Sequence, residues 1–207
     1  MHRVLVDDGH GAELYLADAH PNGAGLVEWG ERNWSTLLEG CVRGTGDASR
    51  MGRLIRDELA RAGREPWRSP DILLRGFRNR QVHGLLDWRL GLDLLATLFD
   101  ESFRPGLDDV LAGDASAPSA WELHARELVS QYAAAFPGCR PLQCERLSGW
   151  QEGVDMTVVV HPLWAGYAGP NNAVELATQW AARQGARSVR LVDSFNLSRR
   201  MVWVRGN

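Results

Sequence analysis

The spacing of apolar residues over the first 136 positions predicts a short hairpin followed by helices. Two runs, Val4–Asp7 and Glu13–Ala17, alternate apolar and polar residues around Gly9-His10-Gly11, which is typical of a β-hairpin. Farther along, apolar residues recur every three or four positions, the period of helices that bury one face. The expected helices cover residues 24–42, begin again at Asp47 or Ser49, run from about 80 to 100, and extend from a cap at Ser119 to about 136.

The expected helix over 80–100 has too many apolar positions for an exposed surface. We therefore expect Leu85, Leu86, Leu92 and Leu95 to be buried and Trp88 to be at least partly buried. In the helix over 24–42 the core candidates are Leu26, Val27, Trp34, Leu37 and Leu38.

The pattern changes after Pro137-Gly138. Thr157–Val160 is a β-branched run, residues 172–184 have helical spacing, Ser188–Val192 predicts a strand, and Met201–Val204 predicts a last strand. The strand–helix–strand unit should be parallel and right-handed. The expected fold is therefore mixed α/β (α+β), an N-terminal hairpin and helical region followed by this unit. The linker-like stretch 104–118 divides the chain into regions 1–118 and 119–207, which we expect to pack as one unit.

Composition indicates where in the cell the protein is expected and argues against a disulfide framework. Hydrophobic residues make up 44% of the 207 positions and charged residues 24%, as in ordinary globular proteins. No apolar run approaches the roughly 18 residues that membrane spanning needs, and the first residues are not those of a signal peptide. We expect a cytoplasmic protein without a membrane partner. The three scattered cysteines agree with a reducing compartment.

All 23 basic residues are arginine. Without a lysine the chain cannot form a P-loop, a Schiff base, a phospholipase-D-type His-x-Lys pair or a lysine-dependent nuclease core. The charges that sum to −3 are unevenly distributed along the chain. Residues 1–40 are acidic, whereas residues 50–80 and 183–205 are rich in arginine. Two local basic segments in an acidic protein indicate a partner bound by one face.

The arginine-rich segments are the candidate nucleic-acid-binding sites. An arginine-studded turn runs into the helix over 80–100, and a second cluster follows Asp193 near the end of the chain. The phosphate-binding candidates are Arg75, Arg78, Asn79, Arg80, Arg199 and Arg200. Trp67, in a loop between Pro66 and Pro70, is a candidate for stacking on an unpaired base.

Three runs carry a resemblance to a known family. RNRQVHGLLDWRLGLDLL (78–95), HPNGAGLVE (20–28) and VDSFNLSRR (192–200) are similar to segments of the C-terminal zinc-binding module of MrfA-type bacterial superfamily 2 DNA helicases, including those of the DISARM and related phage-defence systems. The resemblance implies a helicase partner, DNA and antiviral defence. It also implies a zinc site, but the stretch 67–74 contains no cysteine. We therefore expect neither a metal nor another cofactor.

Two further segments leave alternatives open. The glycine-rich turn of HPNGAG either seats an anion at a helix N-terminus or simply makes a tight turn. His161 follows one predicted strand and Asp193 ends the next, where parallel sheets place binding sites. They would serve acid–base or metal chemistry, or Asp193 would cap the loop that follows it.

The prediction is a non-catalytic accessory module that docks on a DNA helicase or another protein of its complex and helps to hold DNA. No catalytic residue is assigned. The alternatives are a small metal-dependent hydrolase or nuclease that uses His161 and Asp193, and a purely structural scaffold subunit.

Overall fold

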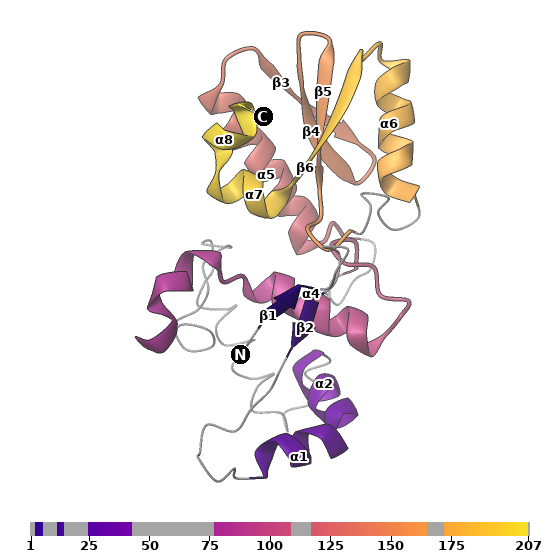
Figure 1. Ribbon diagram of the computed structural model, residues 1–207. Coiled ribbons are helices and arrows are strands. Elements are labelled where there is room, and N and C mark those ends of the chain that lie inside the picture. Colours follow the sequence, from indigo (N-terminus) through magenta and orange to yellow (C-terminus); the bar gives the residue numbers. More distant parts are fainter. Residues whose placement is uncertain are drawn as a thin grey trace.

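A computed structural model describes residues 3–5, 12–14, 25–42, 77–108, 117–164 and 172–206. Figure 1 shows an α/β layer formed by the second half of the chain, with the hairpin and the helices of the first half below it. The fold is mixed α/β, as the sequence predicts. The N-terminal elements are β1 (Arg3–Leu5), β2 (Ala12–Leu14), α1 (Leu26–Arg32), α2 (Trp34–Val42), the 3-10 helix η1 (Phe77–Leu85) and α4 (Trp88–Phe99).

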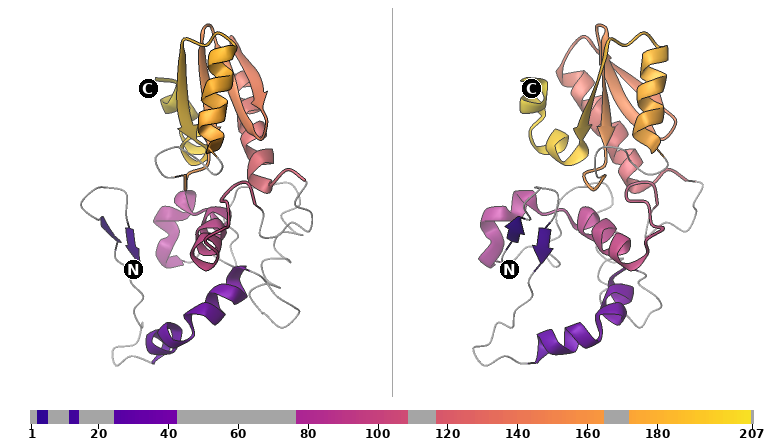
Figure 2. Two further views of the ribbon diagram at one scale, coloured as in Figure 1. Left: turned by 90° about the vertical axis from the view of Figure 1, so that its right-hand side faces the viewer. Right: turned by 45° about the vertical axis from the view of Figure 1, so that its right-hand side comes forward.

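The α/β layer is a four-stranded sheet with helices on both faces. Its strand order is β3-β4-β5-β6, antiparallel except for the parallel pair β5–β6. Helices α5, α7 and α8 cover one face and α6 covers the other (Figures 1 and 2). The elements are α5 (Ala120–Ala135), β3 (Cys139–Cys144), β4 (Leu147–Glu152), β5 (Asp155–Val160), α6 (Ala173–Arg183), β6 (Ser188–Asp193), α7 (Ser194–Arg199) and α8 (Met201–Gly206).

Tight turns and one glycine fix the antiparallel strands in register. Glu145, at φ 50°, and Gly153, at φ 61°, each begin a two-residue turn in the left-handed region. Gly149 of β4 lies against β5 so closely that a Cβ atom there would be 2.1 Å from the Thr157 carbonyl oxygen. Only glycine permits this approach.

The core lies between the sheet and α5. Val158, Val159 and Val160 of β5 are buried, as expected for a strand covered on both faces. On the α5 side, the Tyr132 ring stacks on Trp150 at 4.1 Å between centroids, and both side chains are fully buried. The β-branched residues of β5 therefore belong to the core on both faces of the sheet.

Several predicted elements are confirmed. Strands β1 and β2 pair antiparallel as the expected hairpin, and β5 and β6 pair in parallel. Helix α6 falls within the predicted range. Helix α5 begins at the predicted cap, where the Ser119 hydroxyl accepts from the Glu122 backbone N–H and the Glu122 carboxylate accepts from the Ser119 backbone N–H, a capping box.

Other boundaries were wrong. The expected helix over 24–42 is divided at Asn33, and its core candidates Leu26, Val27 and Trp34 are exposed, whereas Leu37 is half-buried and the Leu38 side chain lies outside the described residues. The run Met201–Val204 forms α8 instead of a strand. Strands β3 and β4 were not predicted at all. The helix expected from Asp47 or Ser49 lies outside the described residues.

The expected helix over 80–100 is two elements. Asp87 interrupts it with an extended backbone, and its carboxylate accepts from the Arg89 and Leu90 backbone N–H groups as the N-cap of α4. Leu85, just before this break, is 55% exposed rather than buried. Leu92 is buried as expected. Leu86, Leu95 and Trp88 are half-buried, which matches the expectation for Trp88 only.

Candidate nucleic-acid interface and adjoining pocket

Arg199 joins the two arginine-rich segments that the sequence singles out. It ends α7, and its Nε donates to the Gly84 carbonyl oxygen of η1 at 2.7 Å. Its Nη2 lies 3.7 Å from Asp87 Oδ2, and its guanidinium lies 3.8 Å from the centroid of the Phe195 ring. These contacts tie the C-terminal cluster to the arginine turn, although 115 residues separate Arg199 from Gly84.

The other candidates differ in their surroundings. Arg80 on η1 and Arg200 after α7 are exposed. We call these two residues, on either side of the Arg199 bridge, the arginine surface. Asn79 is half-buried and its Oδ1 lies 2.8 Å from His83 Nε2, so it supports η1. Arg75 and the Arg78 side chain lie outside the described residues, as does Trp67.

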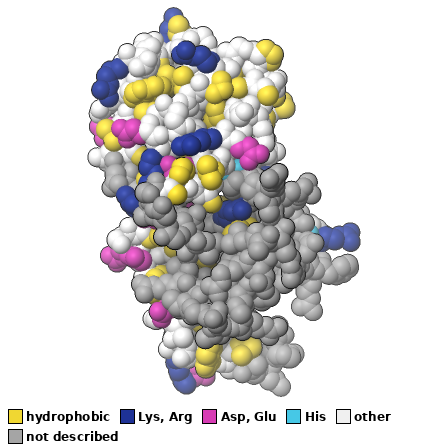
Figure 3. Space-filling view, turned by 180° about the vertical axis from the view of Figure 1, so that it is seen from behind, with side chains coloured by type: hydrophobic (Ala, Val, Ile, Leu, Met, Phe, Trp, Pro, Cys, Tyr) yellow, Lys and Arg dark blue, Asp and Glu magenta, His cyan; other side chains and the backbone are white. Residues whose placement is uncertain are grey.

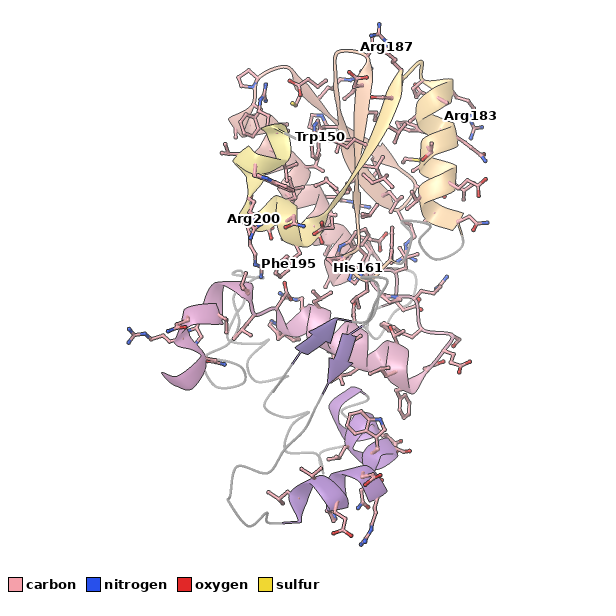
Figure 4. All side chains as sticks on the ribbon, viewed as in Figure 1. Trp150, His161, Arg183, Arg187, Phe195 and Arg200 are labelled. Atoms are coloured by element: carbon pink, nitrogen blue, oxygen red, sulfur yellow. The ribbon has the colours of Figure 1, made fainter. Side chains whose placement is uncertain are left out.

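A pocket of about 190 Å³ lies beside the arginine surface. Residues of α4, of the start of α5 and of α7 line it, together with His161 and Pro162 just after β5 and with Gly106 and Asp108 of the loop after α4. Figure 4 shows His161 and Phe195 on the side of the α/β layer that faces α4, with Arg200 nearby. The pocket therefore opens where the two halves of the chain meet.

His161 lies at the carboxyl end of β5, but its partner is Asp93 of α4. Its Nε2 is 3.0 Å from Asp93 Oδ2, and its Nδ1 accepts from the Leu163 backbone N–H at 3.2 Å. Because Nδ1 accepts, the proton of the neutral ring is on Nε2, which donates to the carboxylate. The side chain is buried, and Trp121 contacts it edge-on. No nitrogen of this ring is left to act as a general base.

Asp193 does not join His161. Its Oδ1 accepts from the Asn196 backbone N–H at 2.8 Å and its Oδ2 from Asn196 Nδ2 at 2.7 Å, which makes it the N-cap of α7. Of the two roles that the sequence leaves open, the structure shows the cap. Sequence reasoning missed Asp93, and the available signal was a lone acid within an otherwise apolar helix.

Gly106 holds this arrangement together. It has φ +75°, and its N–H donates to Asp93 Oδ2 at 3.1 Å. A Cβ atom at this position would lie 2.7 Å from His161 Cδ2 and 3.0 Å from the Trp121 ring. The Ser119 hydroxyl donates to its carbonyl oxygen at 2.5 Å. The loop after α4 thus packs directly on the pocket.

Two more polar side chains line the pocket from the α/β layer. The Ser194 hydroxyl accepts from Trp121 Nε1 at 3.0 Å. Burial lowers the pKa of His124 to about 3, helped by the positive charges of Arg89 and Arg199. His124 is therefore neutral at physiological pH.

An ion pair between the buried Glu122 and the partly exposed Arg146 holds the same loop at a second point. Arg146, in the β3–β4 turn, donates to the two carboxylate oxygens of Glu122 at 2.7 and 2.6 Å and to the Leu107 carbonyl oxygen at 2.7 Å. Burial by itself would raise the pKa of Glu122, but the hydrogen bonds and charge of Arg146, with the hydrogen bonds of Ser119, lower it below its usual value.

Comparisons with known proteins add no relative: no family model, no curated protein and no solved structure matches the chain. None of the helices in the described ranges is long and apolar enough to cross a membrane.

Proposed function

We propose that this protein is a non-catalytic module that holds DNA by its phosphate backbone at the arginine surface. The observation that supports this is the Arg199 bridge, which connects the end of α7, next to the exposed Arg200, with η1, which carries the exposed Arg80 120 positions earlier. Arg199 itself, engaged by Gly84, Asp87 and Phe195, is a positioning residue in this proposal.

Binding of this kind is local and tolerant of sequence. Guanidinium groups on phosphates fix the position of a strand without reading bases. In Figure 3, arginines on the far face of the α/β layer are scattered among apolar and neutral side chains rather than gathered in one patch. With a net charge of −3, the isolated chain should bind DNA weakly and only at low salt.

Hydrolysis by His161 and Asp193 has less support. His161 donates to Asp93 and accepts from Leu163, whereas Asp193 caps α7. The Arg199 bridge would be equally compatible with a structural scaffold that binds no nucleic acid. An experiment must therefore distinguish a scaffold from a DNA-binding module.

The test is a salt titration with a fluorescent single-stranded oligonucleotide, read by anisotropy. Arg80→Ala/Arg200→Ala should reduce the slope of log affinity against log salt by about 1.4, at roughly 0.7 for each lost phosphate contact. The matched control is Arg183→Ala/Arg187→Ala, which removes two exposed arginines at α6 and near β6, away from Arg200 (Figure 4). Equal slopes for both double variants would favour the scaffold.

Docking on a superfamily 2 helicase is the partner that we propose from the resemblance. The exposed apolar side chains of α1, Leu26 at 64% and Trp29 at 53%, support a protein contact there. Leu26→Ser/Trp29→Ser should weaken binding to a purified helicase of that type in calorimetry, and should leave DNA binding unchanged. Unaltered helicase affinity would exclude α1 as the contact.

A further inference from the structure

We propose that the pocket beside the arginine surface accepts one unpaired base of the bound strand. This inference rests on the proposed DNA binding and adds that the strand is single-stranded at this point. The pocket adjoins the arginine surface at α7: Phe195 lines the pocket, and the guanidinium of Arg199, next to Arg200, lies over the same ring at 3.8 Å from its centroid. A strand held at Arg200 therefore passes the pocket.

The size and walls of the pocket fit one flat ring system. Its volume of about 190 Å³ is smaller than the roughly 300–1,000 Å³ typical of pockets for drug-sized ligands. Trp88, Trp121 and Phe195 supply aromatic walls. Stacking on aromatic side chains holds unpaired bases whatever their sequence, because every base has a π-face.

The charge of the lining does not favour a phosphate. Asp87 and Asp108 are each paired with an arginine, Arg199 and Arg104, Asp93 is bonded to His161, and His124 is neutral. The phosphates of a bound strand would therefore stay outside, on the arginine surface, while an uncharged base enters.

Two hydrogen-bonding groups are left for the base. Asp93 Oδ2 is engaged by His161 and Gly106, but Asp93 Oδ1 accepts no hydrogen bond within the described part of the chain. The Ser194 hydroxyl, on a side chain only 4% exposed, accepts from Trp121, and among the described residues its own proton has no acceptor. The pocket thus offers one acceptor and one donor.

This pair suits any of the four bases. Each carries an N–H donor beside an acceptor on its Watson–Crick edge, the edge through which proteins read bases that are splayed out of a strand. The N–H would donate to Asp93 Oδ1, and the neighbouring acceptor would take the proton of Ser194. The pocket therefore recognises the presence of a base rather than its identity.

The experiment compares an oligo(dT) strand with an abasic strand of the same length that has only sugar and phosphate. The wild type should bind oligo(dT) about tenfold more tightly, given roughly 1–3 kcal/mol for one stacked base. Asp93→Asn leaves one oxygen for His161 and Gly106 and turns an N–H toward the base, so it should remove most of the difference. Ser194→Ala should reduce it. Neither variant should change binding of the abasic strand.

Each outcome separates the two proposals. If both strands bind the wild type equally, with a steep salt dependence that Arg80→Ala/Arg200→Ala reduces, the base pocket is refuted and the arginine surface stands. If neither strand binds, both fail. Free thymidine that competes at the concentration needed for oligo(dT) would also overturn the inference, because the pocket would then be a small-molecule site. Circular dichroism and thermal unfolding check that both variants fold.

Discussion

Arg146→Met would remove the guanidinium that neutralises the buried Glu122 carboxylate while keeping a side chain of similar length. Glu122 is 1% exposed, and Arg146 gives it two hydrogen bonds and a positive charge. Breaking a buried pair by removing one partner costs about 3–5 kcal/mol. We expect about 3 kcal/mol at pH 7, because the Arg146 side chain is 38% exposed and the Ser119 N–H still donates to the carboxylate.

The pH dependence of the free energy of unfolding shows whether the charge of Glu122 causes this destabilisation. In the wild type the lowered pKa of Glu122 means that the pair stabilises the fold above the unfolded-state value, about 4.3, and that this stability is lost as the pH falls through the folded-state pKa. In the variant, burial without the guanidinium raises the folded-state pKa instead. The charged carboxylate then destabilises the fold at pH 7, and the penalty shrinks by about 1–2 kcal/mol at pH 5.

The assay is urea unfolding of both proteins at pH 7 and pH 5. His124, whose folded-state pKa is about 3, destabilises either protein as its unfolded-state imidazole protonates below about 6.5, by about 2 kcal/mol at pH 5. This contribution cancels in the difference between variant and wild type. Adding Glu122→Gln to Arg146→Met should recover much of the loss at pH 7. The destabilisation would not come from a buried charge if the difference in unfolding free energy between variant and wild type were the same at both pH values. The same conclusion would follow if Glu122→Gln restored no stability.

Three further changes test the packing of the described residues by thermal or urea unfolding. Gly149→Ala should destabilise by about 3 kcal/mol or more, because its Cβ would meet the Thr157 carbonyl at 2.1 Å; a small effect would mean that β4 and β5 can separate. Gly91→Ala, within α4 and in open space, should stabilise by about 0.5–1 kcal/mol, and a loss would show a constraint on α4. Tyr132→Phe should be neutral or slightly stabilising, because the buried Tyr132 hydroxyl has no partner within the described residues; a loss above about 1 kcal/mol would indicate a bound water.

The elements that the sequence predicted correctly are those with local signals. Helix α5 has a capping box, α6 has the helical period, and β5 is a β-branched run. Strands β3 and β4, CRPLQC and LSGWQE, contain no β-branched residue, so their conformation comes from pairing with each other and with β5. The short alternating run of α8 predicted a strand, yet it packs as a helix that buries Val204.

The break before α4 shows how a polar residue within an apolar run can be misread. The apolar spacing continues through Leu85 and Leu86, so the sequence predicts one helix. Asp87 is a good N-cap, and its carboxylate accepts from the first backbone N–H groups of a new helix. Ending the earlier element there leaves Leu85 outside the packed core.

The candidate site depends on contacts that no local pattern encodes. His161 was identified from its place after a strand, but its partner Asp93 lies 68 positions earlier and Gly106 approaches from a loop. The arginine segments were identified from composition alone. Their proximity depends on Arg199, whose contacts with Gly84 and Asp87 span more than a hundred residues.

The arginines of a chain without lysine serve two physical roles that composition cannot separate. Arg146 and Arg199 each donate in several directions to fixed acceptors, including backbone carbonyls, which suits the rigid fork of a guanidinium better than an ammonium. Arg80 and Arg200 are exposed and are the arginines that we propose for phosphate binding. If binding depends on Arg80 and Arg200 while folding depends on Arg146, the arginine content reflects structure as much as recognition. The net charge of such a protein limits its overall affinity for DNA, and the positions of a few exposed guanidinium groups decide where a strand can bind.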